Sequence, residues 1–380
     1  MESNKADHSK KKSGSISSLF QRSPRKENDS SNEGAAVQEF MLSFRKKLST
    51  FGPNFVSFVY PSSTSNDKGH GLSDQEESEN GLSNNMSALF VISAITGSAI
   101  LSLPLALKDS GWLGVFMIII CGVNSLYAGM ILGWCWNIMQ ESWPEYKKAN
   151  EIPYPEMARR AVGNWMRYTI MVFLVISQVG TCIVYLVLIS KHIEGASSGK
   201  LKFCYMMILA LFLITPLTWF RAPRNFWFMA IIDVFCSTLF IFLLLIAFFI
   251  DKERIGPVSY PQPTFSSFTV SFGSLMFSYA GGGVYPTIQN DMKNRKLFPQ
   301  SVFTGFLLIF ILYIPFAILG YAAYGHTLGN DITETLMKNQ NLKTVAKFLQ
   351  VLSLAQLTTT LVIYLNPTFQ LLEYLLECPK

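Results

Sequence analysis

Long apolar runs without charged residues restrict the fold of this chain more than any other feature. A helix needs about 20 predominantly apolar residues to cross the hydrocarbon core of a bilayer. Eight runs of this kind occur, at Met86–Leu107, Trp112–Gln140, Tyr168–Ser190, Phe203–Phe220, Asn225–Ile250, Phe265–Asn290, Phe298–Gly325 and Phe348–Leu372. They predict an all-α polytopic membrane protein.

The residues before the first run have a different composition. Only 15% of the whole chain is charged, whereas soluble domains average about a quarter, and many of these charges lie in residues 1–84 among serines and asparagines. Such a segment buries too little apolar surface to offset the entropy lost on ordering. We therefore expect a disordered N-terminal region, 1–84, followed by a transmembrane domain, 85–380.

Basic residues predict the orientation, because cytoplasmic loops retain Lys and Arg. They cluster in the N-terminal region and between the second and third runs, so we expect a cytoplasmic N-terminus. The net charge of +6 comes from residues that flank membrane spans. It therefore indicates a lipid bilayer as partner and excludes nucleic acid, while the oligomeric state stays open. Residues 146–162 fit either a short amphipathic helix on the membrane surface or an ordinary loop.

Nothing in the sequence resembles an enzyme or a metal centre. No nucleophile–histidine–acid arrangement and no cluster of metal-ligand spacing occurs, and most cysteines lie inside apolar runs. The four histidines are expected in the N-terminal region or in loops: His8, His70, His192 and His326. We predict a protein that is not an enzyme and has no cofactor, with a proton or sodium ion as the only candidate coupling ion.

Two of the eight runs contain weak points for a helix. The first has Gly97 at its middle, and the sixth has the triple glycine Gly281–Gly283 followed by Pro286. Unwound backbone at membrane depth is tolerated only against protein or a wet cavity, where its free N–H and C=O groups can bind the carboxylate and ammonium of a zwitterion. Close helix packing explains Gly97 equally well, but it explains the triple glycine less well.

A family resemblance rests on the same segments. Residues Tyr279–Asn294 resemble the sixth helix of the amino acid/auxin permease family, particularly the vesicular inhibitory amino acid (GABA/glycine) transporter branch. Thr96–Pro104 resembles the first helix of that family, Tyr154–Glu156 its second loop and Leu365–Pro367 its eighth helix. The resemblance covers nearly everything from Asn85 onward and implies an inverted-repeat amino acid transporter with broken first and sixth helices.

The family's substrate site lies between those two helices. Carried over position by position, the resemblance places one side of the site at Thr96, Gly97, Ser98, Ala99 and Ile100, and the other at Tyr279, Ala280, Gly281, Gly282 and Gly283. The third run adds three candidate polar contacts, Ser177, Gln178 and Thr181. Serine and threonine in membrane helices also bond their own backbone, so these contacts have a structural alternative.

The resemblance also implies coupling to protons or sodium. Asp233 is the one charged residue of the fifth run, and a carboxylate within a span is by default a functional hypothesis. It acts either as a proton carrier or as a buried partner of Arg221 or Arg224, and we slightly favour the second. Oxygens suited to sodium come from Thr359, Thr360 and Asn366 in the eighth run, although hydrogen bonds between helices explain them equally well.

Two departures from the family pattern affect the expected function. Ala99 and Ser102 stand where relatives often have glycine, which predicts a smaller pocket. The resemblance implies eleven helices, whereas the sequence ends soon after its eighth run, so we expect an incomplete second repeat.

We predict secondary active transport of small neutral amino acids such as GABA or glycine, coupled to protons. We expect it in a vesicular or lysosomal/vacuolar membrane, with the plasma membrane as the rival location. The alternatives are an amino acid sensor that does not transport and an inactive truncated isoform.

Overall fold

The computed structural model describes most of the predicted membrane domain. Apart from Leu42, the described residues are 81–147, 152–196, 203–216, 227–252, 258–260, 262–329, 332–337 and 342–376. The predicted disordered region, 1–84, thus lies outside the described residues except for Leu42 and residues 81–84.

The described residues form helices joined by short connections. The helices of ten residues or more are α3 (Asn84–Ser110), α4 (Leu113–Ser142), α5 (Pro153–Val162), α6 (Asn164–Ala196), α7 (Phe203–Ile214), α8 (Trp227–Lys252), α9 (Phe265–Ser278), α11 (Phe298–Tyr324) and α13 (Lys343–Leu375). Two short α-helices, α10 (Tyr285–Asn290) and α12 (Ile332–Met337), and the 3₁₀ turns η2 (Pro144–Lys147), η5 (Arg295–Leu297) and η6 (Gly325–Thr327) complete the described elements.

The predicted fold class is confirmed, but the eight predicted spans are not all single helices. Among the described residues, five helices are long and apolar enough to cross a membrane, or six if the bent α3 counts as one span. The sixth predicted span is split into α9 and α10. In the fourth, α7 ends at Ile214, just before Thr215–Pro216, where a proline disfavours continued helix; the rest of that run, 217–220, lies outside the described residues.

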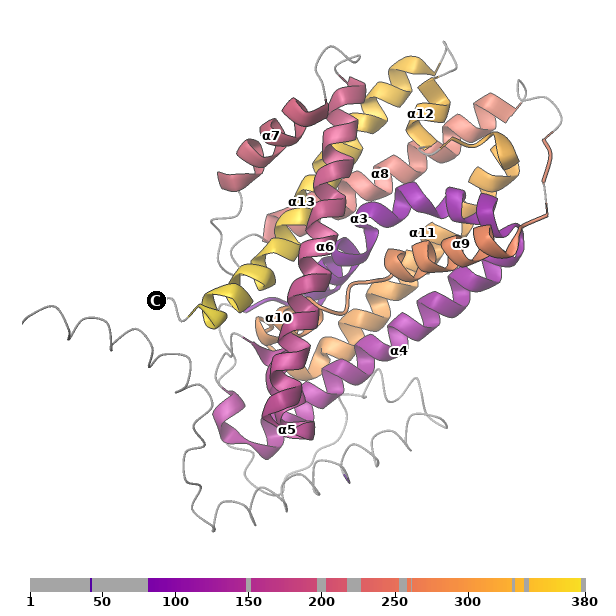
Figure 1. Ribbon diagram of the computed structural model, residues 1–380. Coiled ribbons are helices and arrows are strands. Elements are labelled where there is room, and N and C mark those ends of the chain that lie inside the picture. Colours follow the sequence, from indigo (N-terminus) through magenta and orange to yellow (C-terminus); the bar gives the residue numbers. More distant parts are fainter. Residues whose placement is uncertain are drawn as a thin grey trace, which may run out of the picture.

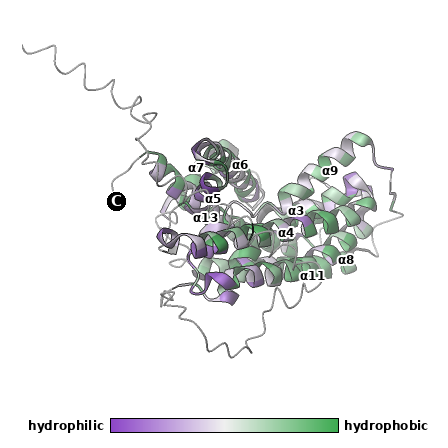
Figure 2. Ribbon diagram, turned by 90° about the horizontal axis from the view of Figure 1, so that it is seen from below, coloured by the Kyte–Doolittle hydropathy of each residue, from purple (hydrophilic) through white to green (hydrophobic). Residues whose placement is uncertain are grey.

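The long helices lie side by side in one bundle (Figure 1). Helix α3 is central, since it packs against α4, α8, α9, α11 and α13. Helix α6 packs along α13 on one flank and α7 packs on α6. Apolar residues dominate the long helices (Figure 2), and many large apolar side chains, such as Phe116 at 65% and Phe212 at 78% exposure, point outward. An apolar exterior of this kind suits lipid rather than water.

The residues that precede α3 are attached to the segment that follows α10. The Leu82 backbone N–H donates to Asp291 O at 2.8 Å, and the Lys293 N–H donates to Leu82 O at 2.9 Å. At the next residue, the Ser83 hydroxyl accepts from the Met86 N–H at 3.3 Å and caps α3. One short backbone pairing therefore fixes the start of α3 relative to the end of α10.

Helix α10 is fixed on its other side by a buried glutamine. The Gln289 amide nitrogen lies 3.0 Å from both Gly133 O and Asn137 Oδ1 of α4, and 3.2 Å from Arg295 O. Gln289 is completely buried, and a buried amide is costly unless it is hydrogen-bonded. These bonds hold the short helix against α4.

Helix α5 settles one open interpretation, because residues 153–162 form a helix and not an ordinary loop. Its Glu156 is 5% exposed and lies 2.8 Å from both Arg159 Nε and Arg167 Nη2. The Tyr146 hydroxyl donates to the same carboxylate at 3.0 Å. Burial raises the pKa of the Tyr146 phenol, which keeps this donor protonated. Through Glu156, α5 is bonded to both η2 and α6 across one end of the bundle (Figure 1).

The predicted location of one histidine is wrong. His192, predicted in a loop, lies in α6 and is 2% exposed, with Nε2 at 3.3 Å from the Ser353 Oγ of α13. Helix α6 extends six residues beyond the predicted end of the third run, Ser190, which brings the histidine into the α6–α13 contact. His326 does lie in a connection, in η6.

Candidate functional site

The predicted break in the sixth span is present. Helix α9 ends at Ser278 and α10 begins at Tyr285. Between them the Gly281 N–H donates to Tyr279 O at 2.9 Å, and the Val284 N–H donates to Gly281 O at 3.2 Å. These turn-like bonds replace the regular helical ladder. Pro286, which lacks an N–H, stands in the first turn of α10, where proline is tolerated. We call residues 279–284 the glycine break.

The three glycines of the break have different surroundings. None has a left-handed backbone conformation. A Cβ at Gly281 would lie 2.8 Å from the Tyr285 hydroxyl, and one at Gly283 would lie 3.2 Å from the Gln178 amide nitrogen, but a Cβ at Gly282 would meet nothing within 4 Å. Neither backbone strain nor packing therefore requires glycine at position 282. Its missing side chain leaves open space beside the break.

The predicted break in the first span is instead a bend. Helix α3 stays helical throughout, and its two parts, Asn84–Gly97 and Ala99–Ser110, meet at 48°. Four carbonyls before the bend accept hydrogen bonds from side chains of other helices: Ala94 O from Tyr364 (2.8 Å), Ile95 O from Tyr313 (3.2 Å), and Thr96 O and Gly97 O from Gln356 (3.1 and 3.2 Å). Such side chains supply the partners that backbone groups at a bend need.

One tyrosine connects the bend to the break. The Tyr364 hydroxyl lies 2.8 Å from Ala94 O of α3 and 2.6 Å from Ala280 O of the glycine break. A hydroxyl has one proton, so it donates to one of these carbonyls at a time. The two predicted halves of the site therefore face each other across a single side chain of α13.

Helix α6 covers the bend with a second tyrosine. The ring of Tyr185 lies 5.8 Å from that of Tyr364, centroid to centroid. Its ring carbons lie 2.7 Å from where a Cβ of Gly97 would stand, and its hydroxyl lies closer still. Gly97 is thus required for close packing, the alternative that the sequence left open.

The close approach of Tyr185 to Gly97 leads to a prediction about the stability of the protein. We expect Gly97→Ala to lower the free energy of unfolding by about 1–3 kcal/mol, because Tyr185 must be displaced. The matched control is Gly180→Ala on α6, where a Cβ meets nothing within 4 Å and alanine improves helix propensity. Thermal unfolding in detergent compares the two. Equal melting temperatures for Gly97→Ala and the unchanged protein would mean that Tyr185 moves away without cost.

Most of the predicted site residues converge on this region. Thr96, Ala99, Ile100 and Tyr279 are at most 2% exposed, whereas Ala280 is exposed and Gly282 and Gly283 are half-buried. The Ser98 side chain lies outside what the structure describes. The break is therefore covered at Tyr279, whose ring packs against α11, and more open at Ala280, Gly282 and Gly283.

The three candidates in α6 differ from one another. The Gln178 amide nitrogen lies 3.4 Å from Gly283 O, and its oxygen accepts from Thr368 of α13 at 2.6 Å. Gln178 thus joins α6 and α13 to the break. Thr181 donates to Ser177 O within its own helix at 2.9 Å, and Ser177 is exposed. Only Gln178 of the three has a hydrogen bond to the break among the described contacts.

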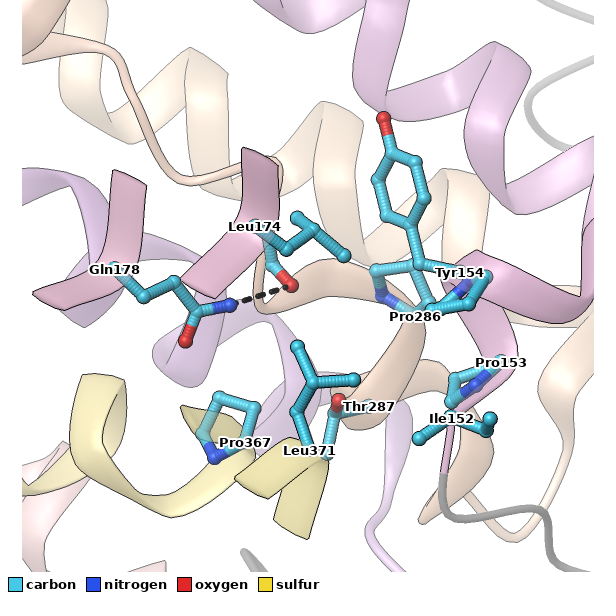
Figure 3. A pocket seen from close by; sticks show the side chains of 11 residues that line it. Ile152, Pro153, Tyr154, Leu174, Gln178, Pro286, Thr287, Pro367 and Leu371 are labelled. Atoms are coloured by element: carbon cyan, nitrogen blue, oxygen red, sulfur yellow. Dashed lines mark hydrogen bonds between the residues drawn. The ribbon is translucent and has the colours of Figure 1, made fainter. Parts of the chain in front are cut away.

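A small pocket lies between the break and α5 (Figure 3). Its volume is about 20 Å³, which is room for about one water molecule. It is lined by Ile152, Pro153, Tyr154 and Pro155 of the α5 segment, Leu174 and Gln178 of α6, Gly283, Pro286 and Thr287 of the break and α10, and Pro367 and Leu371 of α13. Helix α5 therefore covers this side of the break, and the pocket as it stands is too small for an amino acid.

Of the four ion-coupling candidates, Asp233, Thr359 and Thr360 are joined by hydrogen bonds. Asp233 is completely buried, and its carboxylate accepts from the hydroxyls of Thr96 (3.2 Å), Thr359 (3.0 Å) and Thr360 (2.9 Å). Asn366 instead accepts from Gln370, one turn away in α13. The proposed arginine partners, Arg221 and Arg224, lie outside the described residues.

The residues of the site that were not predicted from the sequence include Tyr185, Gln356 and Tyr364. Gln356 had a usable signal, because an amide in an apolar run needs a buried partner. The two tyrosines had none, since tyrosine is common in membrane helices and its partners here lie more than 80 residues away in sequence.

The family model and the relatives that this chain matches are all described as amino acid transporters. A family model described as transmembrane amino acid transporter protein matches residues 80–379. Amino acid transporter AVT1D of Arabidopsis thaliana is 26% identical over 258 residues, covering 64% of this chain and 44% of the relative. Amino acid transporter AVT3B of the same plant is 23% identical, with 74% and 70% covered. Vacuolar amino acid transporter 4 of Saccharomyces cerevisiae is 24% identical, with 62% and 33% covered. The chain spans about half the length of relatives such as AVT1D.

Proposed function

Since this chain belongs to the transmembrane amino acid transporter family, we propose that it carries amino acids across a membrane. The substrate binds between the bend of α3 and the glycine break, and helix groups then move relative to one another to open the site to the other side. The observation that carries this proposal is the Tyr364 hydroxyl, which lies within hydrogen-bonding distance of both α3 and the break.

The finer parts of the proposal concern substrate and location. Tyr185 lies on Gly97 and leaves little room on the α3 side, which favours small neutral amino acids such as glycine or GABA. The open space at Gly282 supports the break as the place where the substrate's charged groups meet backbone. The names of relatives such as Vacuolar amino acid transporter 4 support a vacuolar or lysosomal membrane. We place the N-terminus in the cytoplasm because of the basic residues before α3.

Reconstituted vesicles test the proposal. Vesicles containing the protein and preloaded with an unlabelled amino acid should take up the same labelled amino acid by counterflow, which requires no coupling ion. A panel of glycine, GABA, alanine, leucine and arginine should give the highest rates for the small neutral members. Saturable binding of the same amino acids without counterflow would instead identify a sensor. Absence of both binding and counterflow would refute a transport role for this chain.

A further inference from the structure

Asp233 lies where three helices meet. Helix α8 packs against α3 and α13, and the three lie side by side in Figure 1. The threonine hydroxyls of α3 and α13 that contact its carboxylate are themselves buried or half-buried. A charge removed from water so completely must have partners or be neutralised.

Within the part of the chain that the structure describes, the partners of Asp233 are hydroxyls and not cations. Among the described residues Asp233 has no ion pair, and the nearby titratable groups are Tyr313 of α11 and Cys236 of α8 itself. From α3 and α13, the groups facing it are hydroxyls, those of Thr96, Thr359 and Thr360 and that of Ser93. An isolated buried carboxylate is far more costly than a buried carboxylic acid. This environment therefore accommodates a proton on Asp233.

The threonines accommodate both protonation states. Thr359 Oγ1 lies 3.0 Å from Asp233 Oδ1 but also 2.8 Å from Gln356 O and 3.1 Å from Ala355 O. Thr360 Oγ1 lies 2.9 Å from Asp233 Oδ1 and 3.1 Å from Gln356 O. Each hydroxyl can donate to the ionised carboxylate, or it can rotate to the α13 backbone and accept from the protonated acid. A proton can bind or leave without displacement of heavy atoms.

The backbone carbonyls beside this group already have hydrogen-bond donors. A bend in a membrane helix offers sodium its backbone carbonyl oxygens. Here Thr96 O and Gly97 O accept from the Gln356 amide, at 3.1 and 3.2 Å. One lone pair of each of these oxygens is therefore already used by the Gln356 amide, which leaves fewer free backbone ligands for a cation. Gln356 is 2% exposed, so it cannot turn to water.

We propose that Asp233 binds the coupling proton of the transport cycle. The proposal rests on the transport function above. Thr96 links the proton to the substrate site, because its hydroxyl donates to Asp233 while its carbonyl accepts from Gln356. Loss of the proton strengthens the Thr96–Asp233 bond, and this change acts directly on the bend of α3.

The test separates transport from coupling. In reconstituted vesicles we expect the unchanged protein to show counterflow at equal pH on both sides. An imposed pH gradient should drive accumulation equally well with sodium or with choline as the only salt. Asp233→Asn should keep counterflow at a reduced rate but lose accumulation driven by the pH gradient. Asp109→Asn, at the end of α3 and away from this group, should keep both.

Accumulation that requires sodium, or an Asp233→Asn variant that still accumulates substrate in a pH gradient, would overturn the proposal. Absence of counterflow in the unchanged protein would refute the transport function instead.

A direct measurement covers the case in which Asp233→Asn does not fold or flux is absent. Infrared difference spectra recorded across a pH titration should contain a carboxylic acid band. Thr360→Val should move the midpoint of this band to higher pH, because the ionised carboxylate loses a donor. If Asp233→Asn folds, the band should be missing from it. A titration unaffected by Thr360→Val would contradict Asp233 as the proton site.

Discussion

Replacing Gly282 with leucine should reduce amino acid uptake to the background of empty vesicles while leaving the protein folded. A Cβ at this position meets nothing within 4 Å, and the backbone there is not left-handed. The larger side chain therefore enters open space, where we place the substrate. Uptake of labelled glycine or GABA measures the first effect, and thermal unfolding in detergent measures the second.

The matched control for this variant is Gly273→Leu. Gly273 lies in α9, a few residues before the break, and its Cβ also meets nothing within 4 Å. Both variants add the same side chain to the same predicted span, but only one adds it at the break. Normal uptake by Gly282→Leu would exclude the glycine break as the binding place. Loss of uptake in both variants would show a general intolerance of α9 and α10 to added bulk.

Replacing Glu156 with alanine should lower the free energy of unfolding by about 3–5 kcal/mol, because it leaves buried charges without their partner. The Glu156 side chain is 6% exposed, and the side chains of Arg167 and Arg159 are 15% and 33% exposed. Without the carboxylate, these guanidinium groups repel each other near the Tyr146 hydroxyl. Denaturant unfolding followed by tryptophan fluorescence gives the difference.

Glu145→Ala is the control for this prediction. Its carboxylate pairs with Arg160, but the Glu145 side chain is 57% exposed. Exposed ion pairs contribute about 0–1 kcal/mol to stability. The free energy of unfolding of this variant should therefore be close to that of the unchanged protein. If Glu156→Ala lowered the free energy of unfolding as little as Glu145→Ala does, the contacts of α5 with α6 would depend on apolar packing alone. The ion pairs of Glu156 would then add little to stability.

The membrane helices follow from the sequence because their cause is local. An apolar run without charges forms a helix in lipid wherever it occurs, and each of the eight runs contains helix in the described residues. Local composition also predicted the break at Gly281–Gly283, since glycine and proline act on their own turn of helix. At Gly97 it predicted the place but not the form of the interruption: the span bends there by 48°, while the helix continues and Tyr313, Gln356 and Tyr364 donate to its carbonyls.

Contacts between distant residues decided the parts that sequence analysis missed. Asp233 could be singled out as a charge within a span, but its threonine partners in α3 and α13 stand more than 120 residues away. Only the three-dimensional structure shows that hydroxyls from two other helices surround this carboxylate. The burial of His192 likewise depends on how far α6 continues and on where α13 lies.

The backbone pairing of Leu82 with Asp291 and Lys293 has a mechanical consequence. Because both ends of the pairing belong to stretches that flank the site, a tilt of α3 carries α10 with it, and the two walls shift as one piece. The stretch Gly81–Ser83 is thus a mechanical link between the first and the sixth predicted spans.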